Sequence, residues 1–331
     1  MAPGQPAIAG LNTFIMTAQR MQLADGRWHF QHGPMDIIMD ARGRSEAVAA
    51  AHERAWLRFS GILAELVREL PELRRPVGHG CVLRGPVARR MWHACKPHSQ
   101  SFITPMAAVA GAVAQELIAC YRVHGVDRAW ANNGGDIALH LAPSQSVRVG
   151  LFSDLSRLDV DALKGSRCQG LQTDGYFEVC SDDLVRGVAT SGWRGRSFSL
   201  GIADSVTVLA RSAADADAAA TVIANAVNVS DARIARKAAC DVKDDTDLGD
   251  LLVTVDVPQL EPALVQQALR SGLHRAQALQ AAGLVWFAVL VCQRQIVTTS
   301  GAAQRSMKIP DKDNHSPKHA VRPLQLGSVF S

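Results

Sequence analysis

The chain has 331 residues, of which 47% are hydrophobic, 20% charged and 5% aromatic, and its formal net charge is +4. This length and apolar content allow a sizeable core, in one large domain or two smaller ones. The weak positive charge and the few aromatic side chains argue against nucleic-acid binding. The seven cysteines are widely spaced and form no C-x-x-C pair, which fits neither a disulfide framework nor a zinc ribbon.

The sequence gives no indication of export or membrane insertion. Residues 1–12 lack a basic segment followed by a long apolar run, and no stretch of about eighteen apolar residues occurs anywhere. We therefore expect a cytoplasmic protein with mostly buried thiols and without a membrane partner.

The N-terminal part is predicted to start with a strand pair and continue with helices. Within residues 27–40, apolar and polar side chains alternate on either side of a Gly-Pro pair, which predicts a β-hairpin. Ser45 is expected to be the N-cap of a long helix, whose apolar residues recur at spacings of three and four until Pro71. Helices are also expected over 86–95 and from Pro105 to about Val123. The second is so rich in small residues that another backbone should approach it closely.

Strands prevail in the following part of the chain. They are predicted over residues 128–131, 137–141, 147–151, 176–180, 185–189, 199–210 and 251–257. Ser212 and Asp215 form a capping-box pattern, which predicts a helix from about Ala213 to Val227. Residues 241–250 form an acidic loop whose spacing does not match an EF-hand.

The C-terminal part is predicted to contain the last helix and hairpin of the domain, followed by a disordered tail. A helix is expected over 261–282, followed by a hairpin over 284–298 that turns near Gln293-Arg294. From residue 299 onward the chain is polar. We therefore expect a single domain over residues 1–298 and a disordered tail over 299–331.

A polar pair interrupts the otherwise apolar helix predicted after Ser212. Asp217 and Thr221 are four residues apart, so a helix places them on one face, one turn apart. Two hard oxygen ligands at this spacing suit Mg²⁺, and water molecules and substrate phosphates would complete its coordination shell. The alternative is an exposed Asp217 that complements the helix dipole, with Thr221 bonded back to a carbonyl.

A glycine pair stands between two predicted strands, in the segment Asn132 to Asp136. Without side chains at Gly134 and Gly135, backbone N–H groups could approach a phosphate closely. The same segment also suits an ordinary hairpin turn. Both descriptions can hold together, because a turn can be sharp where a ligand passes.

The segment from Thr190 to Arg196 reads T-S-G-W-R-G-R and follows a predicted strand. The planar forks of Arg194 and Arg196 suit phosphate or carboxylate recognition. Ser191 could act as a nucleophile only with a base, and the sequence offers His29, His32, His93 and His98 by residue type alone. The alternative is a solvated turn.

Together these segments resemble the ApbE-type FMN transferase superfamily, whose members use FAD and Mg²⁺ to attach FMN to a protein threonine. The glycine turn is similar to the family's N-x-G-G-D segment, residues 190–192 to its T-S-G, and residues 217–221 to its D-A-x-A-T metal helix. The resemblance also implies a backbone carbonyl ligand within residues 105–111.

Two elements of the transferases have no counterpart here. Ala110-Gly111 stands where the family has a K-G motif, and the H-x-x-D-P-x-T-G loop between T-S-G and the metal helix is missing. The chain is most similar to a branch in which T-P-M-A-A-V-A-G, N-N-G-G-D-I and T-S-G-W-R-G-R-S occur together.

The resemblance implies an α/β (α+β) layered fold of mixed sheets covered by helices, with one site for Mg²⁺ and for FAD or another phosphorylated or anionic ligand. Asp217 and Thr221 would hold the metal, and Ser191, Arg194 and Arg196 are the candidate catalytic residues. The candidate cofactor-binding residues are Asn132, Asn133, Gly134, Gly135, Asp136, Thr190 and Gly192. The activity that this resemblance implies is that of a divergent flavin transferase or a pyrophosphate-cleaving enzyme. Two alternatives use the same pocket: a hydrolase of a small cyclic or amide substrate, with Ser191 or metal-bound water as nucleophile, and a non-catalytic flavin or nucleotide carrier.

Overall fold

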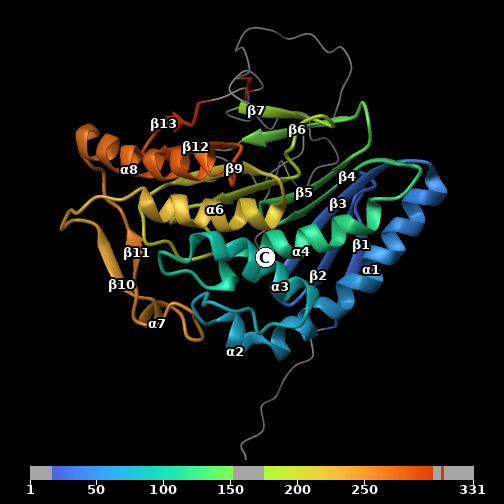
Figure 1. Cartoon of the computed structure of the whole chain (residues 1–331), viewed down its shortest axis with the longest axis horizontal. Helices are drawn as coiled ribbons and strands as arrows, with labels where there is room; N and C mark the ends of the chain where they lie inside the picture. Colours follow the sequence, from blue (N-terminus) through green and yellow to red (C-terminus); the bar gives the residue numbers. More distant parts are fainter. Residues whose placement is uncertain (1–16, 152–174, 301–306, 309–331) are drawn as a thin grey trace, which may run out of the picture.

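A nine-stranded sheet runs through the protein in the order β1-β2-β3-β4-β5-β8-β9-β12-β13 (Figure 1). The computed structural model describes residues 17–151, 175–300 and 307–308. Every strand pairing within these ranges is antiparallel. The strands of the large sheet are β1 (Gln19–Gln22), β2 (Trp28–His32), β3 (Met35–Gly43), β4 (Val126–Asn133), β5 (Asp136–Leu141), β8 (Gly187–Ser191), β9 (Ser205–Ala210), β12 (Phe287–Cys292) and β13 (Gln295–Thr298).

Helices cover one face of this sheet, and a small second sheet covers part of the other (Figure 1). The helices are α1 (Ser45–Arg68), α2 (Leu70–Leu73), α3 (Pro86–Cys95), α4 (Val109–Ile118), α6 (Ala213–Ala226), α7 (Ala239–Val242) and α8 (Pro262–Ala281). The second sheet consists of β6 (Ser146–Leu151), β7 (Gly175–Cys180) and β14 (Met307–Lys308), while β10 (Ala235–Ala238) and β11 (Leu252–Asp256) form a separate pair.

The central strands are continuously apolar because both of their faces are buried. In β12, Ala288 and Leu290 belong to the core under α6 and α8, whereas Phe287 and Val289 belong to the core under the second sheet. The alternation of side chains along a strand explains this division. Phe177 of β7 meets Phe287 edge to face, with ring centroids 5.4 Å apart, and so joins the two sheets.

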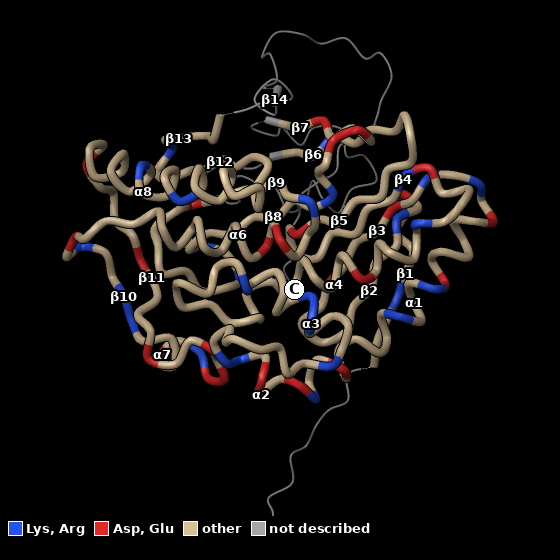
Figure 2. The backbone as a smooth tube through the Cα atoms, in the orientation of Figure 1, with Lys and Arg blue, Asp and Glu red and all other residues tan. Residues whose placement is uncertain are grey.

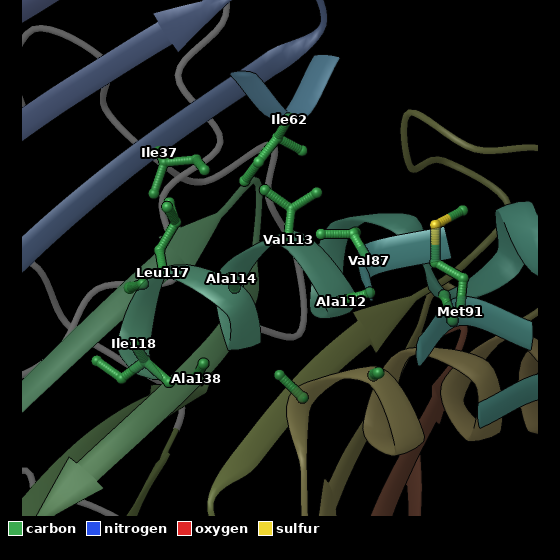
Figure 3. Close-up of a cluster of buried hydrophobic side chains, with 14 of the residues drawn as sticks. Ile37, Ile62, Val87, Met91, Ala112, Val113, Ala114, Leu117, Ile118 and Ala138 are labelled. Atoms are coloured by element: carbon green, nitrogen blue, oxygen red, sulfur yellow. The ribbon is translucent and has the colours of Figure 1, made fainter. Parts of the chain in front are cut away.

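The small residues of α4 let it lie close to its neighbours. Figure 3 shows Ala112, Val113 and Leu117 of α4 among side chains of β3, α1 and α3. A Cβ added at Gly111 would lie 2.2 Å from the backbone oxygen of Ala213, at the start of α6. The predicted close approach of a second backbone to this helix is therefore confirmed.

The layered α/β architecture and most predicted elements are confirmed. The N-cap prediction is wrong: α1 starts at Ser45, Arg44 is its N-cap, and no side chain caps it. The strand predicted over 199–210 is shortened to β9, because Asn225 Oδ1 accepts the Leu200 N–H and Ile202 bonds Val227 in a loop. The strand predicted over 185–189 instead covers the residues of β8, because its pairing with β5 begins at Gly187. Most of the predicted tail lies outside the described residues.

Candidate functional site

One cavity of about 2120 Å³ brings together the segments that the sequence analysis selected. Ten of the candidate residues line it, from the glycine turn and the start of β5, from the end of β8 and the segment after it, and from α6. They are Gly134, Gly135, Asp136, Thr190, Ser191, Gly192, Arg194, Arg196, Asp217 and Thr221. The other two candidates, Asn132 and Asn133, are buried behind the turn.

The glycine turn is a two-residue hairpin connection between β4 and β5. Gly134 and Gly135 have φ angles of +66° and +116°, which favour glycine. Asn132 Oδ1 accepts the Gly135 N–H at 2.8 Å, and Asn133 Nδ2 donates to the Ala110 carbonyl at 3.1 Å. The two asparagines therefore fix the turn, and the Gly135 N–H is engaged within the protein.

Arg196 lies directly over this turn. A Cβ at Gly134 would be 1.6 Å from Arg196 Nη2 and 2.7 Å from its Cζ, so a side chain there would displace the guanidinium group from this position. Arg196 is also close enough to Asp136 to favour its charged form. The exposed Arg196 side chain thus places a positive group over the turn, at the cavity surface.

Asp136 and Asp217 form a pair of carboxyl groups from distant parts of the sequence. Burial raises the pKa of Asp136 to about 7, against the opposing effects of the Thr190 N–H, 3.2 Å from Oδ1, and of Arg196. Burial and the neighbouring Asp136 raise the pKa of Asp217 well above its usual range. Two such carboxyl groups are costly to ionise together unless a cation or a proton lies close by.

Asp217 and Thr221 share the cavity-facing side of α6, as the four-residue spacing predicts. Asp217 Oδ2 accepts the Gly111 N–H at 2.9 Å. Thr221 lines the cavity, and its hydroxyl makes no hydrogen bond within the described part of the chain. No cluster of three or more His, Cys, Asp or Glu side chains suited to a metal occurs among the described residues. A carboxylate and a hydroxyl, completed by water, form the sparse oxygen set typical of Mg²⁺.

The end of β8 and the segment after it supply hydroxyl and guanidinium groups, but no nucleophile–base pair is found there among the described residues. Thr190 Oγ1 lies 3.0 Å from Thr207 Oγ1, and Arg194 stacks 4.8 Å from the Trp193 ring centroid. No hydrogen bond from Ser191 Oγ to a histidine is found in the ranges that the structure covers. Of the four histidines considered as bases, His32 lines the cavity. His29 instead pairs with Asp36 at 2.8 Å.

The loop after α7 forms a wall of the cavity that sequence reasoning did not assign to the site. Lys243, Asp245 and Asp247 all line the cavity. Asp245 pairs with Arg74, and Asp247 accepts a hydrogen bond from Thr104. Figure 2 shows charged residues of both signs where this loop approaches α2. The acidic composition of residues 241–250 indicated the loop itself. Its place in the cavity could not be predicted, because Arg74 and Thr104, which it contacts, are distant in the sequence.

The chain belongs to the family described as "AbpE bacteria", whose family model matches residues 19–302. A UPF0280 protein of Methanothrix thermoacetophila is 37% identical over 142 residues, which are 43% of this chain and 52% of that protein. A UPF0280 protein of Methanopyrus kandleri is 38% identical over 166 residues, 50% of this chain and 59% of that protein. The matches thus span little more than half the length of these relatives.

Two solved structures align with most of the chain. The apo form of the flavinyl transferase ApbE of Pseudomonas stutzeri aligns with 89% of this chain and 97% of its own, at 12% identity and a TM-score of 0.39. The ApbE protein of Thermotoga maritima aligns with 88% and 98%, at 13% identity and a TM-score of 0.37. These scores are low, and family membership therefore rests on the family model. Within the described ranges, no helix has the length and apolar character needed to cross a membrane.

Proposed function

We propose that the cavity binds a phosphorylated or otherwise anionic small molecule together with Mg²⁺, and that FAD is the first ligand to test. The observation that carries this proposal is the neighbouring pair of buried Asp136 and half-buried Asp217, which lines one large cavity together with the Arg196 guanidinium. A bound cation would stabilise the ionised form of these two carboxyl groups, and Arg196 would provide a positive partner for an anionic ligand.

Asp217 and Thr221 would hold the metal ion. Their oxygen atoms are hard ligands on one face of α6, and the Thr221 hydroxyl has no competing hydrogen bond within the described residues. When bound, Mg²⁺ would supply charge stabilisation at a phosphoryl oxygen. Asp136 stands beside this pair and would favour cation binding through its own charge.

Arg196 and Arg194 would bind the anionic group of the ligand. Both side chains are exposed at the cavity: Arg196 lies against Gly134, and Arg194 can move toward a ligand from its stacked position on Trp193. Since the Gly135 N–H already donates to Asn132, this proposal assigns anion recognition to the guanidinium groups rather than to the backbone of the turn.

The test is thermal unfolding with FAD, with and without Mg²⁺. A ligand at about a hundred times its dissociation constant adds about 2.7 kcal/mol to the free energy of unfolding, which shifts the melting temperature measurably. We expect a Mg²⁺-dependent shift that Asp217→Asn abolishes and that the exposed control Asp256→Asn retains. Thr221→Val, which loses no hydrogen bond among the residues that the structure describes, provides a second variant in case Asp217→Asn folds poorly.

The outcome against the proposal is equally clear. If neither FAD nor inorganic pyrophosphate stabilises the protein with Mg²⁺, or if Thr221→Val and Asp217→Asn respond like the unmodified chain, the assigned site is wrong. Where FAD binds, chromatographic detection of FMN and AMP separates an enzyme that cleaves the pyrophosphate bond from a carrier that only binds the nucleotide.

A further inference from the structure

One wall of the cavity is apolar and lies on helices that the proposed phosphate and metal site does not use. We define this apolar wall as Leu63 and Val67 of α1, Leu70 of α2, Met91 of α3, and Phe102 and Met106 from the segment that follows α3. All six line the same cavity as Asp136, Asp217 and Arg196. A ligand bound at the charged groups therefore has direct access to an apolar surface.

The apolar wall is partly exposed, although it faces a concave surface. Val67 keeps 56% and Phe102 keeps 41% of its surface exposed. Apolar side chains gathered at a hollow are a mark of ligand binding, because their exposure to water is unfavourable until something covers them. Leu63 and Val67 alone span about 6 Å along α1, at about 1.5 Å per residue.

The size of the cavity agrees with a ligand larger than a charged group alone. Its volume of about 2120 Å³ is well above the roughly 300–1,000 Å³ that is typical of small-molecule pockets. The charged residues occupy one part of its lining, and the apolar wall provides another.

The chemistry of the wall favours a hydrocarbon over a nitrogen-rich ring. Its leucine, valine, methionine and phenylalanine side chains contain no nitrogen or oxygen atom, so they offer no partner to the polar edge of a heteroaromatic ring. Burying such an edge without hydrogen bonds is costly, whereas burying hydrocarbon is favourable.

We infer that the ligand of this site is an amphipathic anion, in which a phosphate or diphosphate is joined to a long hydrocarbon group that lies on the apolar wall. This inference rests on the proposed function, since it uses the same Mg²⁺ and anion site for the charged end. The class of ligand it names is the hydrocarbon diphosphates, such as prenyl diphosphates.

The test compares ligands that share a diphosphate and differ in hydrocarbon length. Inorganic pyrophosphate, isopentenyl diphosphate and farnesyl diphosphate are titrated into the full chain with Mg²⁺ by calorimetry, below the concentration at which farnesyl diphosphate forms micelles. We expect farnesyl diphosphate to bind at least about tenfold more tightly than isopentenyl diphosphate, because its longer chain buries more apolar surface.

A matched pair of variants on α1 tests whether this gain in affinity comes from the apolar wall. Val67→Glu places a charge on the apolar wall and should remove the advantage of farnesyl over isopentenyl diphosphate while pyrophosphate binding is kept. Leu57→Glu makes the same kind of change on the same helix, at a side chain that is 72% exposed and does not line the cavity. It should leave all three affinities unchanged.

The results that overturn the inference differ from those that overturn the proposed function. Equal binding of isopentenyl and farnesyl diphosphate, with pyrophosphate still bound, refutes the hydrocarbon and keeps the anion site. Loss of FAD binding in Val67→Glu, without a loss for farnesyl diphosphate, assigns the wall to a flavin ring and also refutes the inference. Absence of binding by all of the diphosphates and by FAD refutes both proposals.

Discussion

Gly111 of α4 lies against the start of α6, and Gly111→Ala tests this contact. The same substitution at Gly61 provides the control. In Gly111→Ala, the added Cβ would lie 2.2 Å from Ala213 O and 2.9 Å from Asp217 Cβ, where 3.4 Å or more is ordinary contact. The helices must therefore separate by about 1 Å in a close-packed region, where overpacking costs about 1–3 kcal/mol or more. Against this, alanine is better than glycine in a helix by about 0.5–1 kcal/mol. We expect a net loss of about 2 kcal/mol.

Gly61→Ala should have the opposite sign. Its added Cβ would meet only side-chain atoms of Glu65 and Arg58, at 3.8 and 4.0 Å. Without a clash, the helix gains about 0.5–1 kcal/mol. Urea unfolding, followed by circular dichroism, measures both variants through the midpoint at unchanged slope. A Gly111→Ala protein as stable as the unmodified chain would show that the two helices do not pack as described.

Three further predictions concern the core, the pH dependence and the cavity wall. Phe177→Ala removes a fully buried ring that packs on Phe287 and should lower the free energy of unfolding by about 3–5 kcal/mol in urea; a loss below 1 kcal/mol would contradict the sheet packing. Burial lowers the pKa of His98 to about 4, below about 6.5 in the unfolded chain, so its stabilising contribution is present above pH 6.5 and is lost as the pH falls toward 4. His98→Gln should flatten the decline of the melting temperature across that interval, and an unchanged slope would exclude His98 as its source. Arg74→Gln breaks the pairing with Asp245 and should speed proteolytic cleavage in the loop after α7 without changing cleavage elsewhere.

Local patterns were sufficient to predict most elements of the fold. The helix over 86–95 and the hairpin turning at Gln293-Arg294 were found from proline placement and β-prone residues, and both are present. Boundaries failed where long-range contacts decide them. The strand expected from Ser199 starts only at Ser205, because Asn225, on a helix more than twenty residues away in sequence, binds the intervening loop.

The candidate site could be predicted in composition but not in arrangement. The four-residue spacing of Asp217 and Thr221 was enough to place them on one face of α6. That Asp136 would lie beside Asp217, and that Arg196 would cover Gly134, depends on how β5, α6 and the segment after β8 meet in space. No local spacing encodes such contacts. For the same reason, the helical spacing of the apolar residues in α1 did not indicate that some of them line the cavity.

The contact between Arg196 and Gly134 has a consequence for the history of this family. The space that a side chain at position 134 would need is filled by the guanidinium group of Arg196. A relative that acquires any side chain at this turn must therefore move or shorten the residue that corresponds to Arg196. A substitution at position 134 is therefore expected to change where the charge of Arg196 lies, although the two positions are sixty-two apart along the chain.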